Sequence, residues 1–156
     1  MIKQLTVKEI LTKAIQREIE AQKLYRDLSG NVTNEATQDM LRELSRVEEK
    51  HEDLLRRYMR GEMAEGALGK DDMLDYRIAE HLEQPPITKD MRLDRVLLLA
   101  ANREKASHEF YLDLALAHPP GKTRTLIEEL ASQELVHKQR VESLYTEVAF
   151  PQTDGG

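Results

Sequence analysis

Four stretches of the chain place apolar residues at the three- and four-residue spacing of a single helix face. They cover about residues 7–29, 34–60, 92–117 and 125–149. The segments 6–9 and 125–128 each have the form of a capping box that begins a helix, and Thr33 or Asn34 can cap the second stretch. Gly30-Asn31 is expected to end the first. No strand-like alternation competes with this pattern, which therefore predicts an all-α chain.

The segment between the second and third stretches, about residues 61–90, is the least regular part. It contains three glycines and Pro85-Pro86, with a short helix expected within 72–83. Connections this long are uncommon inside a compact domain unless they serve a purpose. A crossover along the length of a helical bundle, joining two parallel helices, explains it. The sequence thus predicts one domain over residues 1–150 and a disordered tail at 151–156.

Polar residues interrupt the apolar stripes near the middle of each predicted helix. Glu18 and Glu104 stand in the stripes of the first and third helices, where leucine would be expected. On the second helix, Glu48 and His51 are three residues apart, so their side chains lie one turn apart on one face. The fourth helix repeats that pair as Glu134 and His137. Burial of such groups is costly unless a partner compensates for their lost hydration.

The chain contains an internal repeat with an offset of 86 residues. The same offset relates several apolar positions of the two halves, such as Leu11 and Leu97. It also maps Glu18, Tyr25, Glu48 and His51 onto Glu104, Tyr111, Glu134 and His137. Two helical hairpins of one design, joined by a long crossover, form a four-helix bundle with approximate twofold symmetry.

The symmetry brings four carboxylates and two imidazoles to one level of the bundle core. Four carboxylates in one place would repel each other and remain partly protonated. Two divalent cations cancel their charge and use all six ligands. Hard oxygen ligands with one nitrogen per metal suit Fe(II) or Mn(II) and tolerate Zn(II). One Glu from each of two helices and Glu-x-x-His from each of the other two is the ligand set of ferritin-like di-iron and di-manganese proteins.

Composition narrows the possible functions. The chain has 156 residues, a formal net charge of -6 and no cysteine. Without cysteine there are no disulfides, thiolate zinc sites or iron–sulfur centres. The negative charge gives no reason to expect a nucleic-acid partner, and no apolar run approaches the length of a membrane span. Charged residues at the N-terminus leave no signal-peptide core, so a cytoplasmic location is expected.

These motifs make the sequence resemble the ferritin-like superfamily, and within it the rubrerythrin-type di-iron proteins, here without a rubredoxin module. The resemblance covers about residues 7–149 and rests on the segments 18–25, 48–51, 104–111 and 134–137. It implies two iron ions, for which Mn or Zn can substitute. It also implies terminal ligands at Glu18 and Glu104, bridging ligands at Glu48 and Glu134, and one histidine per metal, His51 and His137. By the same resemblance, the hydroxyls of Tyr25 and Tyr111 would steady the ligand carboxylates.

The sequence departs from typical rubrerythrins in two ways. Those proteins carry a four-cysteine rubredoxin module that passes electrons to the di-iron site, so this chain would need an external electron-donor protein. They also carry an extra Glu one turn after the third-helix ligand. Here that position is Ser107, and its repeat mate is Ala21, two small residues that leave space for O2, peroxide or solvent. His108 follows, and it either reaches the site or faces a neighbouring helix.

Three classes of function fit these observations. The first is a di-iron oxidoreductase that reacts with peroxide or O2, in oxidative stress or iron metabolism. The second is a ferroxidase or iron-storage protein of bacterioferritin type, although the tail after Pro151 is too short for a fifth helix. The third is a metal-free interaction bundle. A homodimer is expected, because bundles of this family commonly pair along exposed helix faces.

Overall fold

A computed structural model describes residues 4–63 and 77–150 of the chain. These residues form four long helices and one short helix, without a strand. The helices are α1 (Val7–Asn31), α2 (Glu35–Met59), α3 (Ile78–His81), α4 (Leu93–Leu116) and α5 (Lys122–Ala149). The prediction of an all-α chain is confirmed.

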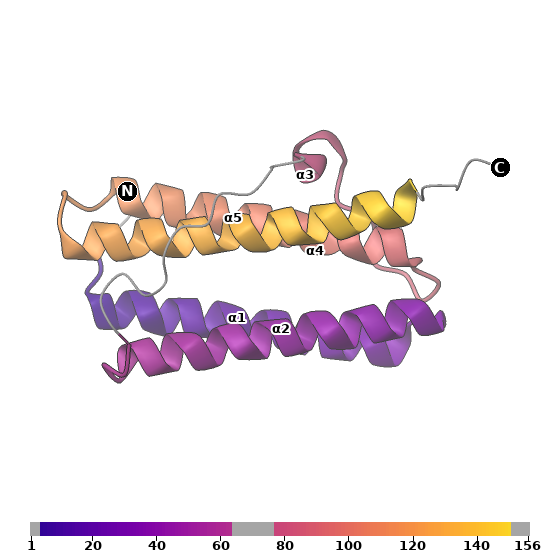
Figure 1. The fold of residues 1–156 in the computed structure, drawn as a ribbon, viewed down its shortest axis with the longest axis horizontal. Coiled ribbons are helices and arrows are strands. Elements are labelled where there is room, and N and C mark those ends of the chain that lie inside the picture. The colour runs from indigo at the N-terminus through magenta and orange to yellow at the C-terminus, as the bar shows by residue number, and fades with distance from the viewer. Residues whose placement is uncertain (1–3, 64–76, 151–156) are drawn as a thin grey trace.

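The long helices form two antiparallel hairpins that lie against each other (Figure 1). One hairpin consists of α1 and α2, and the other consists of α4 and α5. Helix α2 ends at one end of the bundle and α4 begins at the other, so these two helices run in the same direction (Figure 1). The short helix α3 belongs to this connection and packs against α4. The two helices that the expected crossover joins are therefore parallel, as the sequence predicts.

Two of the expected helix starts are observed. The Thr6 side chain accepts a hydrogen bond from the backbone N–H of Glu9 at 3.1 Å and begins α1. The Asn34 side chain accepts from the backbone N–H of Thr37 at 3.0 Å and begins α2. Each cap satisfies a backbone donor that has no partner within its helix.

Other predicted boundaries are wrong. Helix α1 continues through Gly30 to Asn31, and the N–H of Val32 still donates to the Leu28 carbonyl at 3.0 Å. Helix α5 begins at Lys122 rather than Thr125, because the Thr125 backbone N–H already donates to the Gly121 carbonyl at 3.0 Å. The expected helix within 72–83 is only Ile78–His81 in the described part of the chain; the stretch 64–76 and the predicted tail at 151–156 lie outside it.

The apolar core is divided into two clusters at the two ends of the bundle. One contains Ile10, Leu11 and Leu55 with the start of α5, and the other contains Leu28, Leu41 and the start of α4. The glutamates predicted as ligands are buried between them, at mid-helix positions. The folding energy supplied by these clusters therefore holds a polar layer in the middle of the bundle.

The second half of α5 differs from the sequence pattern. The apolar Leu144 is 36% exposed, whereas the charged Glu142 is 0% exposed. The carboxylate of Glu142 accepts from the backbone N–H of Ala79 in α3 at 2.8 Å and pairs with Lys138 Nζ at 3.0 Å. Lys138 Nζ also lies 2.9 Å from Glu80 Oε1. The crossover covers this part of α5 and buries charged side chains there.

Candidate metal centre

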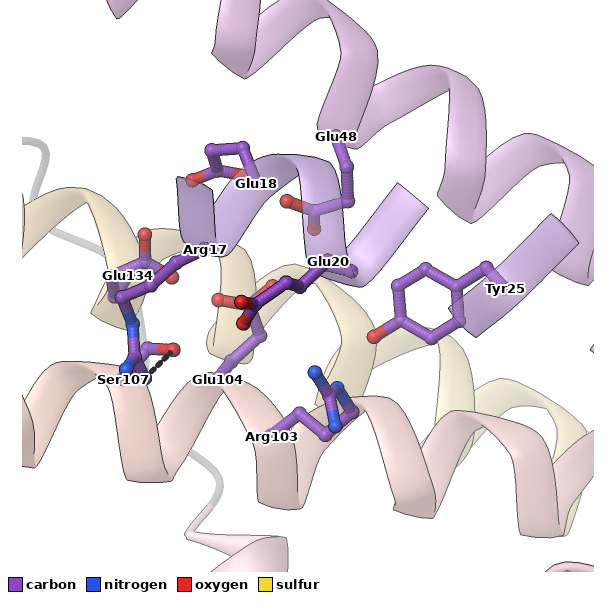
Figure 2. Close-up of a pocket in the computed structure, with 10 residues that line it drawn as sticks. Arg17, Glu18, Glu20, Tyr25, Glu48, Arg103, Glu104, Ser107 and Glu134 are labelled. Atoms are coloured by element: carbon purple, nitrogen blue, oxygen red, sulfur yellow. Dashed lines mark hydrogen bonds between the residues drawn. The ribbon is translucent and has the colours of Figure 1, made fainter. Parts of the chain in front are cut away.

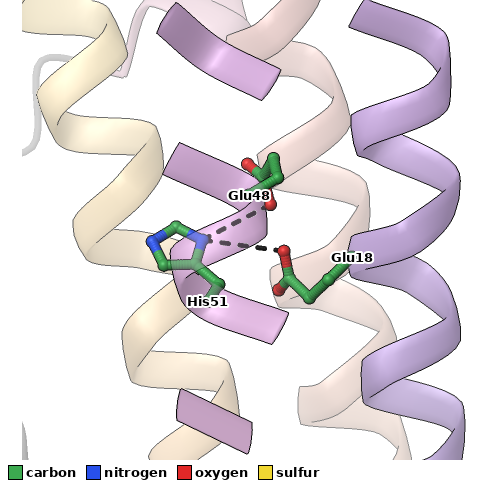
Figure 3. Close-up of side chains that lie close together, drawn as sticks. All are labelled: Glu18, Glu48 and His51. Carbon is green, nitrogen blue, oxygen red and sulfur yellow. Dashed lines mark hydrogen bonds and ion pairs between the residues drawn. The ribbon is translucent and has the colours of Figure 1, made fainter. Parts of the chain in front are cut away.

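Glu18, Glu48 and His51 form one of two polar clusters in the core, and α1 and α2 supply its residues. His51 Nδ1 lies 3.6 Å from Glu18 Oε2 and 3.4 Å from Glu48 Oε2 (Figure 3). Both glutamates are at least nine-tenths buried. Glu48 and His51 meet because they are one turn apart on α2, and α1 brings Glu18 across the hairpin.

Glu104, Glu134 and His137 form the matching cluster in the second hairpin. His137 Nδ1 lies 3.9 Å from Glu104 Oε2 and 4.0 Å from Glu134 Oε2. In each cluster, one donor atom from each of the three side chains lies within 4.8 Å of the others. The two clusters are adjacent, since the rings of His51 and His137 stack with centroids 3.6 Å apart. The six residues singled out in the sequence are thus brought together.

Several atoms of these clusters that could bind a metal are buried without a hydrogen-bond partner. They are Glu18 Oε2, Glu104 Oε2 and His137 Nδ1. A buried polar atom without a partner costs free energy, typically about 1–3 kcal/mol. Because the atoms converge from both hairpins, and because carboxylate oxygens with imidazole nitrogens suit divalent iron or manganese, a pair of metal ions fits this arrangement.

The carboxyl groups of the centre share their protons unequally. Burial, followed by interactions with Glu48 and Glu134, raises the pKa of Glu18 well above its usual range. Burial and the charge of Glu134 likewise raise the pKa of Glu104. Burial alone would raise the pKa of Glu48 as well, but hydrogen bonds from Glu18 and His51 outweigh this effect and lower the pKa to about 2. Without metal, Glu48 therefore carries negative charge and Glu18 and Glu104 tend to hold protons.

His137 is held in its neutral form. Burial and the neighbouring His51 lower the pKa of His137 to about 3. Neutral imidazole is the form that binds metal ions. Its Nδ1 atom, which faces Glu104 and Glu134, is the donor that a metal would meet.

Comparison with known proteins agrees with this geometry. A family model described as Rubrerythrin matches residues 9–145. The chain belongs to the rubrerythrin family. Membership and the two carboxylate–histidine clusters together suggest a di-iron site.

A solved structure of a hypothetical protein from Pyrococcus furiosus is similar to this rubrerythrin-family chain. The two are 23% identical, with a TM-score of 0.52, and the match covers 96% of this chain and 94% of the other. At this identity the likeness supports the fold alone. No curated protein matches the chain significantly. Among the described helices, none combines the length and apolar character that crossing a bilayer requires.

Tyr25 and Tyr111 are both buried beside the carboxylates. Burial, then the charge of Glu104, raises the pKa of Tyr25 well above its usual value, and burial with the charge of Glu134 also raises that of Tyr111. The Tyr25 hydroxyl points toward the carboxylates (Figure 2). Within the described residues, no hydrogen bond joins either hydroxyl to them, so the role expected from the family stays a prediction.

Ala21 and Ser107 line a cavity of about 90 Å³ that reaches the carboxylates of Glu18, Glu48, Glu104 and Glu134. The space expected beside these two small residues is present. His108 does not line this cavity. Its Nδ1 lies 2.6 Å from the Ala131 carbonyl and donates to it, so His108 faces α5.

His118 carries no functional signal in the sequence, yet it is 4% exposed. The backbone N–H of Leu5 donates to its Nε2 at 2.8 Å, and its Nδ1 donates to the Leu114 carbonyl at 2.8 Å. The ring therefore ties the segment before α1 to the end of α4. Because 113 residues separate Leu5 from His118, local sequence reasoning could not detect this contact.

Proposed function

We propose that this protein binds two iron ions and acts as an oxidoreductase that reduces peroxide or O2. The proposed ligands are Glu18, Glu48, His51, Glu104, Glu134 and His137. Glu18 and Glu104 are assigned as terminal ligands, and Glu48 and Glu134 as bridges. Manganese or zinc can substitute for iron at such a site.

The observation that carries the proposal is the pair of buried clusters with unpartnered donor atoms. Glu18 Oε2, Glu104 Oε2 and His137 Nδ1 lack hydrogen bonds although they are buried. A structural role alone would favour pairing these atoms with donors, as in most protein interiors. Their convergence supports metal binding over a metal-free interaction bundle.

Two Fe(II) ions would supply together the two electrons that convert one hydrogen peroxide and two protons into two waters. The chain's own groups prepare the site for this reaction. Glu18 and Glu104 give up their protons when cations arrive. Ala21 and Ser107 leave room beside the carboxylates for a small oxidant. An external electron-donor protein is proposed to return the irons to Fe(II) for turnover, because the chain's residues include no cysteine for a thiolate-bound redox centre.

Anaerobic loading with Fe(II), followed by stopped-flow spectroscopy, tests the proposal. We expect about two metal ions per chain and about two Fe(II) oxidised per peroxide consumed, with O2 tested in a separate experiment. Metal content well below one per chain under iron-replete conditions would contradict the site. Bound iron that reacts with neither oxidant would contradict the oxidoreductase function.

The alternative is a ferroxidase that stores iron, of bacterioferritin type. A storage shell would elute from size-exclusion chromatography far ahead of a dimer and would take up iron well beyond two ions per chain. The homodimer that we propose would elute near twice the chain mass of 18.0 kDa. It would bind no more than about two iron ions per chain.

A further inference from the structure

Two arginines line the cavity that reaches the carboxylates. Arg17 lies on α1 immediately before Glu18, and Arg103 lies on α4 immediately before Glu104. The repeat offset of 86 residues relates the two arginines, as it relates the two glutamates. In the view of Figure 2 the Arg17 side chain reaches Ser107, and the Arg103 side chain lies on the other side of Glu104.

Arg17 is fixed in position by its neighbours. Its Nη2 donates a hydrogen bond to Ser107 Oγ at 2.8 Å (Figure 2). The guanidinium carbon lies 4.6 Å from the centroid of the Phe110 ring, a distance typical of a cation–π contact. Arg17 Nε is buried and has no hydrogen-bond partner. The side chain is therefore held in place while some of its donors remain available.

Arg103 also retains free donors. Its Nε is buried without a hydrogen-bond partner. Within the described residues, neither Arg17 nor Arg103 forms an ion pair of 4.0 Å or less, although both line a cavity rich in carboxylates. Salt bridges with the glutamates thus do not explain why either arginine lines the cavity.

Metal binding would make the formal charge of the cavity positive. Its lining contains five glutamates, namely the four proposed ligands and Glu20, and two arginines, a formal charge of -3 when all are ionised. Two divalent cations would bring this charge to about +1. The cavity would then attract an anion, and the free N–H groups of the arginines could bind it through charge-assisted hydrogen bonds.

We propose that Arg17, Arg103 and Ser107 form a subsite for a small monoanion beside the metal pair. This inference rests on the proposed function, since it requires the metals. The cavity of about 90 Å³ is smaller than one that holds benzene, about 150 Å³, so the ligand has few heavy atoms. The class includes hydroperoxide, nitrite, formate and azide. Ser107 acts by positioning Arg17.

Azide is the probe, titrated into Co(II)-loaded protein and followed by the visible spectrum of the metal and by calorimetry. We expect Arg17→Gln and Arg103→Gln each to raise the azide Kd about tenfold while the metal content stays unchanged. Arg17→Lys and Arg103→Lys keep the charge and should change Kd less than threefold. The control is Arg42→Gln on α2, an exposed arginine paired with Asp39 at 3.3 Å, which should leave Kd unchanged.

The wild-type protein supplies a second measurement that does not depend on how the variants fold. Nitrite and formate should compete with azide, whereas neutral formamide, similar in size to formate, should not. Equal azide Kd values in the wild type and both Gln variants, or competition by formamide as strong as by formate, would overturn the subsite alone. A protein that takes up no metal would overturn the proposed function and the subsite with it.

Discussion

The rings of His51 and His137 stack face to face across the two hairpins, with centroids 3.6 Å apart and planes inclined by 4°. Each ring turns its Nδ1 toward the glutamates of its own hairpin. Two imidazolium ions at this separation would repel strongly, which agrees with the lowering of the His137 pKa to about 3 by burial and by His51. The contact therefore favours neutral imidazole in at least one half of the centre.

Metal loading should release protons, and they should come from carboxyl groups rather than from His137. Burial and neighbouring carboxylates raise the pKa of Glu18 and of Glu104, and a metal binds only their ionised forms. Near pH 5–6 we expect about two protons released for two Zn(II) bound. Calorimetry in buffers with different ionisation enthalpies measures this number. The Glu49→Gln variant should give the same value, and release of no protons would contradict the assigned protonation.

The stability of the metal-free protein should fall as pH rises from about 5 towards 8. Since the folded-state pKa values of Glu18 and Glu104 are raised, the folded protein keeps protons that the unfolded chain loses near pH 4.3. That stabilisation is complete below the unfolded pKa and disappears as pH rises through the folded pKa. The expected loss is about 1.4 kcal/mol of unfolding free energy per pH unit for each of these carboxyl groups while it keeps its proton.

Two other groups act in the opposite direction at lower pH. The pKa of His137 is lowered to about 3, so its contribution is present above about pH 6.5 and is lost as pH falls toward 3. Glu48, whose pKa is lowered to about 2, destabilises the fold only as pH falls below about 4. Urea unfolding between pH 4 and 8.5 should thus show a decline in stability that is shallower below about pH 6.5, where His137 opposes it, than above that pH. Zn(II) should remove the decline at high pH, and identical profiles with and without metal would contradict the crowding of carboxylates.

Metal content should depend on which face of α2 is altered. Glu48→Ala removes a proposed bridge and should reduce the metal content from about two ions to less than one per chain. Glu49→Ala is the matched control, because Glu49 is exposed on the same helix. Elemental analysis of both variants, with circular dichroism to confirm their helices, provides the measurement. Equal losses of metal in the two variants would show that the face of α2 assigned to the site is wrong.

The bundle and its polar layer could be predicted because their signals are periodic and repeated. Glu18 and Glu104 interrupt apolar stripes at equivalent positions, which no local preference explains. Arg17 and Arg103 share the same offset, but a charge next to a ligand usually indicates a solvated helix face, so the sequence alone gave no reason to select them. Their role becomes apparent only when the cavity and their unpaired donors are seen.

Features that depend on contacts between distant segments could not be predicted. Lys138 and Glu142 have the spacing of an ordinary exposed ion pair on a helix. They are 1% and 0% exposed because the crossover covers them. The start of α5 at Lys122 could not be predicted for a different, local reason, because the helix follows Gly121, which provides no side-chain cap.

The buried cluster formed by Lys138, Glu142 and Glu80 leads to a prediction about stability. Lys138 Nζ lies 3.0 Å from Glu142 and 2.9 Å from Glu80. Lys138→Ala would leave two carboxylates facing each other, one of them fully buried, and should lower the free energy of unfolding by about 3–5 kcal/mol. The double variant Lys138→Met, Glu142→Leu removes both charges and should recover at least half of that loss.

Arg46→Ala is the control, because it breaks a well-exposed pair with Glu43 and should cost less than about 1 kcal/mol. Urea unfolding of the metal-free variants at pH 6 measures all three values. A loss below about 1 kcal/mol for Lys138→Ala would mean that α3 does not cover this lysine of α5 in solution.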